Sequence, residues 1–182
     1  MNRYTTISCK HKLLTLLCLV VLILPGCASQ PQIFSDFDQR HDFSQDRTFT
    51  WLQDPPMLPA GDDVVSVLTE SRMTSAIKGE LIAKGYTFVK DQADADFSVL
   101  YTIGARDRLH ISTYTNGTIA VDMFDVTSKQ PIWHAKWSKH LSRKQRQSIG
   151  KNAEQIAFLL LKHFPVIGCK IETSKQCRPF DE

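Results

Sequence analysis

Apolar and polar residues recur with two different periods along this chain of 182 residues. Apolar residues at every second position predict strands, and apolar residues three or four positions apart predict amphipathic helices. Two segments have the helical period, and several others alternate or are rich in β-branched and aromatic residues. The pattern therefore predicts a domain that contains both helices and strands.

The first predicted helix runs from Val64 to Lys84. We expect Asp62 or Asp63 to cap its N-terminus and Gly85 to cap its C-terminus, where a positive φ is common. Its core-facing rows contain Leu68, Met73, Ala76, Ile77 and Leu81.

A second helix is predicted before Pro165, which marks its end. If Ser142 and Gln145 form a capping box, this helix begins near Ser142; the alternative is a start at Ser148. The apolar positions with helical spacing are Ile149, Ala153, Ile156, Leu160 and Phe164.

The strands are predicted from alternation and turn signals. Segments 33–38 and 47–52 favour strands, and the proline-rich segment 53–63 is expected to be a loop. Asn116-Gly117 predicts a tight turn within a hairpin over residues 109–126. Two further strands would place one row each in the core: Phe97, Val99, Tyr101 and Ile103 in one, and Trp133, Ala135 and Trp137 in the other.

This order of elements predicts an α+β fold. Short turns between consecutive strands favour a mostly antiparallel sheet, and the two amphipathic helices would pack on one face of it as a two-layer sandwich. Length and composition favour a single domain over residues 33–165.

The N-terminal 26 residues have the plan of a secretory signal peptide. Three basic residues precede an apolar run from Leu13 to Leu24, which is too short for the roughly 20 residues of a membrane-spanning helix. The run ends in Leu24-Pro25-Gly26-Cys27, which resembles the lipobox of bacterial lipoproteins, although the proline departs from the usual residue there. That resemblance implies that Cys27 is acylated and becomes the first mature residue, with residues 27–32 as a tether.

The residue after Cys27 is Ala28 and not an aspartate. By the same resemblance to bacterial lipoproteins, this favours the outer membrane, with the domain on its periplasmic face. The chain has five cysteines. Two of them would be removed with the signal peptide and Cys27 would be acylated, so only Cys169 and Cys177 would remain as thiols in the mature protein. In an oxidising compartment this pair predicts a disulfide in the C-terminal tail, residues 166–182. Two free thiols are the alternative.

The formal net charge of +3 includes three basic residues of the signal, so the mature chain is neutral and nucleic-acid binding is not expected. Residues 28–96 contain 12 acidic and 6 basic residues, whereas residues 97–182 contain 7 and 13. The simplest interpretation is that the two halves fold together and partly compensate each other's charge.

No motif of a nucleophile elbow, a phosphate-binding loop, a zinc protease or a redox dithiol occurs, and we expect no cofactor, no metal site and no catalytic residue. His134 and His140 are interpreted as residues on the wet face of a strand, too far apart to share a metal. Asp122 is interpreted as a solvent-facing position, with a buried carboxylate as the alternative. Three further aspartates, Asp91, Asp94 and Asp96, are interpreted as turn caps before a strand.

A basic segment carries the one local signal for a partner. Arg143, Lys144 and Arg146 crowd the predicted start of a helix, where cations are unfavourable. This predicts contact with an anionic partner such as lipid or an acidic protein surface. The alternative is a solvated loop that faces the acidic half.

Several short motifs together resemble a family of lipoproteins from double-membraned bacteria that is defined by a domain of unknown function. They are, in order, FSDFD, DFSQDRTFTWLQDPP, ELIAKGY, ADFSVLYTIG, TIAVDMFDVTSKQPIWHAKWS and HFP. The resemblance implies an α+β domain on an outer-membrane anchor and brings no catalytic residues. We therefore expect a lipid-anchored binding or envelope-maintenance module; a hydrolase of envelope polymers and a carrier of small apolar ligands are the alternatives.

Overall fold

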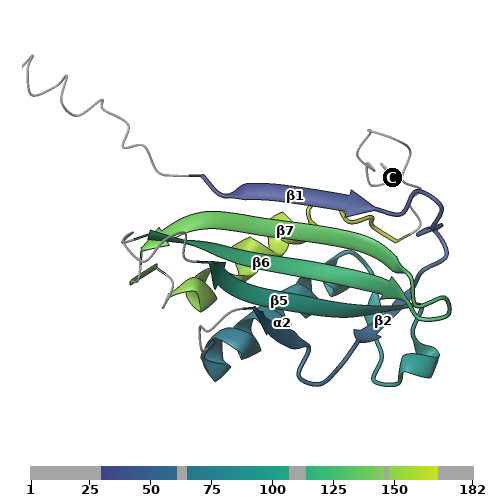
Figure 1. Cartoon of the computed structure of the whole chain (residues 1–182). Coiled ribbons are helices and arrows are strands. Elements are labelled where there is room, and N and C mark those ends of the chain that lie inside the picture. The colour runs from purple at the N-terminus through teal and green to yellow at the C-terminus, as the bar shows by residue number, and fades with distance from the viewer. Residues whose placement is uncertain (1–29, 61–64, 107–113, 143, 146–147, 168–182) are drawn as a thin grey trace, which may run out of the picture.

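The computed structural model describes residues 30–60, 65–106, 114–142, 144–145 and 148–167. The elements in chain order are β1 (Gln32–Phe37), β2 (Thr48–Trp51), β3 (Met57–Ala60), α2 (Val67–Ala83), β4 (Thr87–Phe88), the 3-10 helix η1 (Gln92–Asp94), β5 (Phe97–Arg106), β6 (Tyr114–Asp125), β7 (Pro131–Ser142), the 3-10 helix η2 (Ile149–Asn152) and α4 (Ala153–Leu161). Figure 1 shows the long strands side by side with the two helices behind them, so the α+β class is confirmed.

The sheet is mixed, and the prediction of a mostly antiparallel sheet is wrong. Its strands lie in the order β1-β7-β6-β5-β2-β4, with β3 also paired to β5. β1, β7, β6 and β5 pair antiparallel in succession, whereas β2 and β3 run parallel to β5, and β4 runs parallel to β2. Helix α2 is the physical reason, because a helix that crosses the sheet returns the chain to the end from which it started, and the next strand is then parallel.

β3 lies inside the segment 53–63 that was expected to be a loop. Residues 49–51 pair with 97–99 of β5, and residues 57–60 pair with 101–104 of the same edge. Between them Leu52 donates its N–H to the carbonyl of Val99, and Tyr101 donates to that of Pro56. Pro59 is compatible with this position because β3 is an edge strand, where a missing donor leaves no neighbour unpaired.

The predicted turn at Asn116-Gly117 is also wrong. Both residues lie within β6, opposite Arg106 and Ala105 of β5 on one side and opposite β7 on the other. A Cβ at Gly117 would lie 2.5 Å from Cδ1 of Leu141, which is buried. Glycine is needed at this position because a larger residue would collide with the Leu141 side chain of the neighbouring strand, and not because the backbone turns there.

The alternation in the long strands places the predicted rows in the core. Phe97, Val99, Tyr101 and Ile103 of β5 are buried, as are Trp133, Ala135 and Trp137 of β7. Of α2, Met73, Ala76, Ile77 and Leu81 are buried against them. These predictions are confirmed, but Leu68 is 67% exposed and does not belong to the core.

Helix α2 begins later than predicted and ends where predicted. Ser66 is its N-cap, since its Oγ accepts a hydrogen bond from the N–H of Thr69, while the predicted caps at 62 and 63 lie outside the described residues. Gly85 has φ +98°. The N–H of Gly85 donates to the carbonyl of Ile82, and the N–H of Tyr86 donates to the carbonyl of Leu81. This pair of bonds is the Schellman motif, so the predicted C-terminal glycine is confirmed.

The two helices lie side by side and run in the same direction. At their N-terminal ends, Gly150 of η2 faces Thr69 of α2 so closely that a Cβ would lie 2.8 Å from Thr69 Oγ1 and 3.0 Å from its Cα. At their C-terminal ends, Lys84 Nζ donates to the carbonyl of Phe164 at 2.8 Å, and the N–H of Ile167 donates to the carbonyl of Lys84. Burial lowers the pKa of Lys84.

We predict that two Gly→Ala substitutions in the helix layer have opposite effects. Gly150→Ala should destabilise the fold by about 1–3 kcal/mol, because the methyl group must push α2 away from η2. Gly79→Ala should stabilise it by about 0.5–1 kcal/mol, because Gly79 is exposed within α2 and nothing lies within 4 Å of the place that the added methyl group would take. Chemical denaturation measures both, and an unchanged stability for Gly150→Ala would contradict the close contact.

Candidate functional site

The tether joins the sheet at one defined end. β1 begins at Gln32 opposite Ser138, and β7 continues past this level to Ser142. We call this the tether end; here β1 and β6 begin and β5 and β7 finish. The opposite end of the sheet, with the turn between β6 and β7, is the far end (Figure 1).

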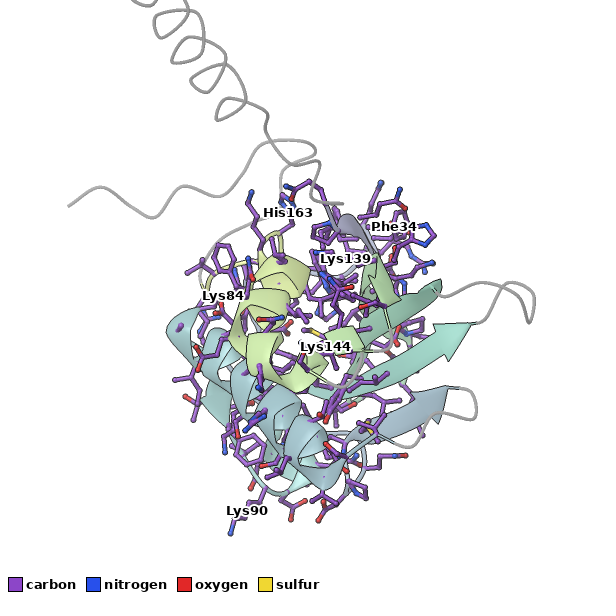
Figure 2. The ribbon with its side chains drawn as sticks, turned by 90° about the vertical axis from the view of Figure 1, so that its left-hand side faces the viewer. Phe34, Lys84, Lys90, Lys139, Lys144 and His163 are labelled. Atoms are coloured by element: carbon purple, nitrogen blue, oxygen red, sulfur yellow. The ribbon has the colours of Figure 1, made fainter. Side chains whose placement is uncertain are left out.

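Basic side chains surround the tether end. No acidic residue occurs between Asp125 and Glu154, a stretch that includes all of β7 and η2. Lys144 and Lys151 are exposed, and Lys139 is half-buried. In Figure 2, which views the molecule from this end, Lys139 is labelled near β1 and Lys144 toward the middle.

The predicted capping box at Ser142 is present. Gln145 Oε1 accepts hydrogen bonds from the N–H and Oγ of Ser142 at 2.9 and 3.0 Å, and Ser142 Oγ accepts from the N–H of Gln145 at 3.4 Å. It caps only a short helical turn, because the helical segment that continues into α4 begins with η2 at Ile149, and its N-cap is Ser148. The alternative start at Ser148 is therefore confirmed. Of the three predicted contact residues, Lys144 is exposed on this turn, and Arg143 and Arg146 lie outside the described residues.

Exposed apolar side chains accompany the lysines. Phe34 of β1 is 57% exposed, and Val67 and Leu68 in the first turn of α2 are 79% and 67% exposed. None of the three was predicted from the sequence as a surface residue of interest. The alternation of β1 would have indicated Phe34, because it lies in one row with the polar residue Asp36, whereas no local signal sets Val67 apart.

The outer face of the sheet, which the helices do not cover, carries a histidine–carboxylate pair. His134 Nδ1 lies 2.7 Å from Asp122 Oδ1 across the β6–β7 pair, and the two side chains are 40% and 31% exposed. The ring of Phe34 lies 6.2 Å from that of His134. The structure therefore places His134 and Asp122 at partly exposed positions, as predicted, and adds that they contact each other.

A second such pair is buried at the far end. His41 Nε2 lies 2.9 Å from Asp46 Oδ2, with side-chain exposures of 15% and 7%. Burial raises the pKa of Asp46, and the hydrogen bond from His41 offsets this only in part. This pair was not predicted from the sequence, because two polar residues in an irregular segment give no sign of burial.

Asp96 has the opposite character. Its Oδ2 accepts hydrogen bonds from the N–H groups of Arg47 and Thr48 at 2.7 and 2.8 Å and from Thr48 Oγ1 at 2.9 Å. Burial by itself would raise the pKa of Asp96, but these hydrogen bonds together outweigh it and lower the pKa. Asp91 caps η1 by accepting from the N–H of Ala93, so the turn-cap interpretation is confirmed for Asp91. It is wrong for Asp96, whose partners lie at the start of β2, far away in the chain, and Asp94 lies in η1 itself.

The three ion pairs found among the described residues do not contribute to the predicted charge compensation between the two halves of the chain. They are Arg40–Asp38, His41–Asp46 and His134–Asp122, and none joins residues 28–96 to residues 97–182. Instead, acids gather at the far end, in the loops and turns over residues 38–47, 89–96 and 125–130: Asp38, Asp42, Asp46, Asp91, Asp94, Asp96 and Asp125. The sheet therefore separates acidic loops from a basic end.

The other predicted sites lie outside the described part of the chain: Cys27, Cys169 and Cys177. Within the described part, no group of three or more histidine, cysteine, aspartate or glutamate side chains is arranged to hold a metal ion. The helices found there are all too short or too polar to span a membrane.

We predict opposite pH dependences for two aspartate substitutions. The folded-state pKa of Asp46 is raised, so its stabilising contribution is present at low pH and is lost as the pH rises through that pKa. Asp46→Asn should therefore gain stability relative to the natural protein between acidic and neutral pH. The pKa of Asp96 is lowered, so Asp96→Asn should cost about 1–2 kcal/mol at neutral pH, and the difference should shrink in acid. Denaturation at several pH values tests both, and parallel pH profiles would contradict the assignment.

Comparisons with known proteins agree with this fold. A family model described as a domain of unknown function (DUF4136) matches residues 33–166. A solved structure of a DUF4136 family protein from Bacteroides thetaiotaomicron is similar with a TM-score of 0.54 and 11% identity, over 70% of this chain and 94% of that one. A PDZ domain protein from Parabacteroides distasonis is similar with a TM-score of 0.52 and 14% identity, over 81% of this chain and 39% of that one.

A lipoprotein from Neisseria meningitidis is similar with a TM-score of 0.38 and 12% identity, over 62% of this chain and 98% of that one, which is too weak to carry an inference. A search of curated protein sequences finds no match. The family model covers well over half of the chain, so the predicted membership of a family defined by a domain of unknown function is confirmed. The chain belongs to the family defined by the domain of unknown function DUF4136.

Proposed function

We propose that this protein is a lipid-anchored lipoprotein on the periplasmic face of the outer membrane and that it acts as a binding or envelope-maintenance module. Acylated Cys27 is the anchor. More than one acyl chain gives stable attachment, because each buried CH₂ contributes about 0.8 kcal/mol. The domain of residues 33–166 then works at the membrane surface.

The observation that carries this proposal is the short distance between the lipobox-like cysteine and the first strand. β1 begins at Gln32, five residues after Cys27. Five extended residues span at most about 17 Å. A signal peptide that ends so close to an edge strand fits a folded domain that is held directly at its membrane, without a long linker.

The described residues support binding more than catalysis. His134 is oriented by Asp122, but no serine, threonine or cysteine side chain in the described part of the chain forms a hydrogen bond with His134. A histidine–carboxylate pair needs such a nucleophile, a bound metal or a closed pocket to act in hydrolysis. We therefore assign no catalytic residue and no cofactor.

The partner that we propose is anionic. Arg143, Lys144 and Arg146 are close in sequence to Ser142 and Gln145, and Lys144, the one of the three that the structure describes, is exposed at the tether end and forms no ion pair with a described residue. This supports an anionic lipid or an acidic envelope protein as the partner. Neutral net charge in the mature chain argues against nucleic acid.

We predict that Cys27→Ser abolishes lipid attachment, because serine has no thiol to acylate. In cells of a double-membraned bacterium, the variant should incorporate no labelled palmitate and should leave the outer-membrane fraction. Cys18→Ser is the matched control, since Cys18 belongs to the signal peptide and its loss should leave labelling intact. Unchanged labelling of Cys27→Ser would refute the anchor.

We also predict a disulfide between Cys169 and Cys177. Protein taken from the periplasm and denatured without reductant should react with no alkylating reagent at these two positions, and it should react at both after reduction. Two alkylated cysteines before reduction would show that the tail carries free thiols.

A further inference from the structure

Six residues from five separate segments lie at the tether end. Phe34 comes from β1, Val67 and Leu68 from the start of α2, Lys139 from β7, Lys144 from the turn after β7 and Lys151 from η2. We call them the tether-end surface. The segments are brought together by the β1–β7 pairing on one side and by the contact of Gly150 with Thr69 on the other.

The tether-end surface contains the three most exposed large apolar side chains among the described residues. They are Val67, Leu68 and Phe34, at 79%, 67% and 57% exposure. Phe34 lies near one edge of the sheet, on its open face, and Val67 and Leu68 begin the helix that follows β3 at the other edge. Phe34 lies opposite Lys136 in the β1–β7 pair, whereas Lys139 belongs to the row of Trp137 and Leu141 on the face that the helices cover. Apolar side chains thus occur at the tether end both on the open face of the sheet and in the helix layer, and Figure 2 shows Phe34 and Lys139 at this end.

The lysines of this surface are available to an external anion. None of Lys139, Lys144 and Lys151 forms an ion pair with another residue of the described part of the chain. Glu70 and Glu154 are the acids in the first turns of α2 and α4, and neither forms an ion pair with these lysines. The seven aspartates of the far-end loops lie at the other end of the sheet.

The tether decides which surface meets the membrane. Gln30 is the first described residue and lies three positions after Cys27. Three extended residues span about 10 Å, which is the same as the depth of the headgroup boundary into which interfacial groups reach. The tether end is therefore the end of the domain that an acylated Cys27 draws to the bilayer.

We propose that the tether-end surface docks on the phospholipid bilayer that holds the anchor. Phe34, Val67 and Leu68 enter the boundary between headgroups and acyl chains, and the three lysines bind phosphates of anionic phospholipids. This proposal rests on the lipid anchor proposed above and names the anionic partner of the basic segment. Docking turns the acidic far-end loops away from the membrane.

Docking can be tested without lipidation on a protein of residues 27–182 that carries Cys27→Ser. This protein has no acyl group, so any binding to vesicles must come from the domain itself. Sedimentation with vesicles of phosphatidylethanolamine and phosphatidylglycerol should show binding that weakens in high salt. Vesicles of phosphatidylcholine should bind much less. Failure of the anchor in cells would leave this result unchanged, so the two proposals fail independently.

Substitution of the lysines tests their role. Lys139→Gln, Lys144→Gln and Lys151→Gln together should weaken binding to the anionic vesicles by about 100-fold, because each lysine near an anionic surface contributes roughly 1 kcal/mol and about 1.4 kcal/mol corresponds to tenfold. Lys90→Gln, Lys129→Gln and Lys162→Gln form the matched control. They remove the same charge from three exposed positions toward the far end and should leave binding within about twofold of the unsubstituted chain.

Substitution of the apolar residues tests insertion. Phe34→Gln, Val67→Thr and Leu68→Gln together should weaken vesicle binding by about tenfold or more, because membrane affinity follows the apolar area buried. Ile82→Gln, Phe158→Gln and Val166→Thr are the control, since these residues are also exposed but lie elsewhere. In addition, the fluorescence of Phe34→Trp should shift to the blue when anionic vesicles are added.

Three outcomes would overturn the proposal while circular dichroism shows folded protein. The first is no binding of the unsubstituted chain to anionic vesicles. The second is an equal loss in the tether-end and control variants. The third is a change in oligomeric state, measured by light scattering, in the apolar variant without a change in vesicle binding, which would assign the surface to contacts between copies of this chain.

Discussion

The ring of Phe164 holds the two layers of this domain together. It lies 5.2 Å from Trp133, 5.4 Å from Tyr86 and 5.7 Å from both Phe43 and Phe97, centroid to centroid. These four residues come from β7, from the segment after α2, from the loop after β1 and from β5. One aromatic side chain after α4 therefore connects the ends of both helices to the sheet, and burial of such rings is among the largest apolar contributions to a core.

Because the helices are held at this point and run in the same direction, the two ends of the domain differ. The aromatic cluster and the acidic loops occupy the far end, where Asp96 accepts hydrogen bonds from the backbone at the start of β2. The tether end contains the beginnings of β1 and α2 and the lysines that follow β7. The separation of charge is thus a consequence of how the strands and helices are directed, and it gives the anchored end of the domain a chemistry that suits an anionic surface.

The residues of the candidate site were predictable only in part. The basic segment around Lys144 stands out because no acid occurs for 28 positions, from 126 to 153, and this is visible without a fold. Val67 and Leu68 do not stand out, because an apolar residue at the start of an amphipathic helix usually belongs to the core. They are exposed because this first turn of α2 packs through Thr69, which is buried next to Gly150 of η2, and this contact depends on residues far away in the chain. The pair of His41 and Asp46 depends on long-range burial, which no local pattern encodes.

The sequence by itself determined the properties that depend on near neighbours along the chain. Alternation placed Phe97, Val99 and Trp137 in the core, helical spacing did the same for Ile77, and a glycine that needs positive φ ended α2 at Gly85. Only the tertiary structure decided the direction of β2 and β3 relative to β5 and the role of Gly117 within β6. Strand direction depends on how a helix crosses the sheet, and the need for a glycine depends on the Leu141 side chain of a neighbouring strand. Such contacts join residues that are far apart in the chain, so their effects cannot be read from local periodicity.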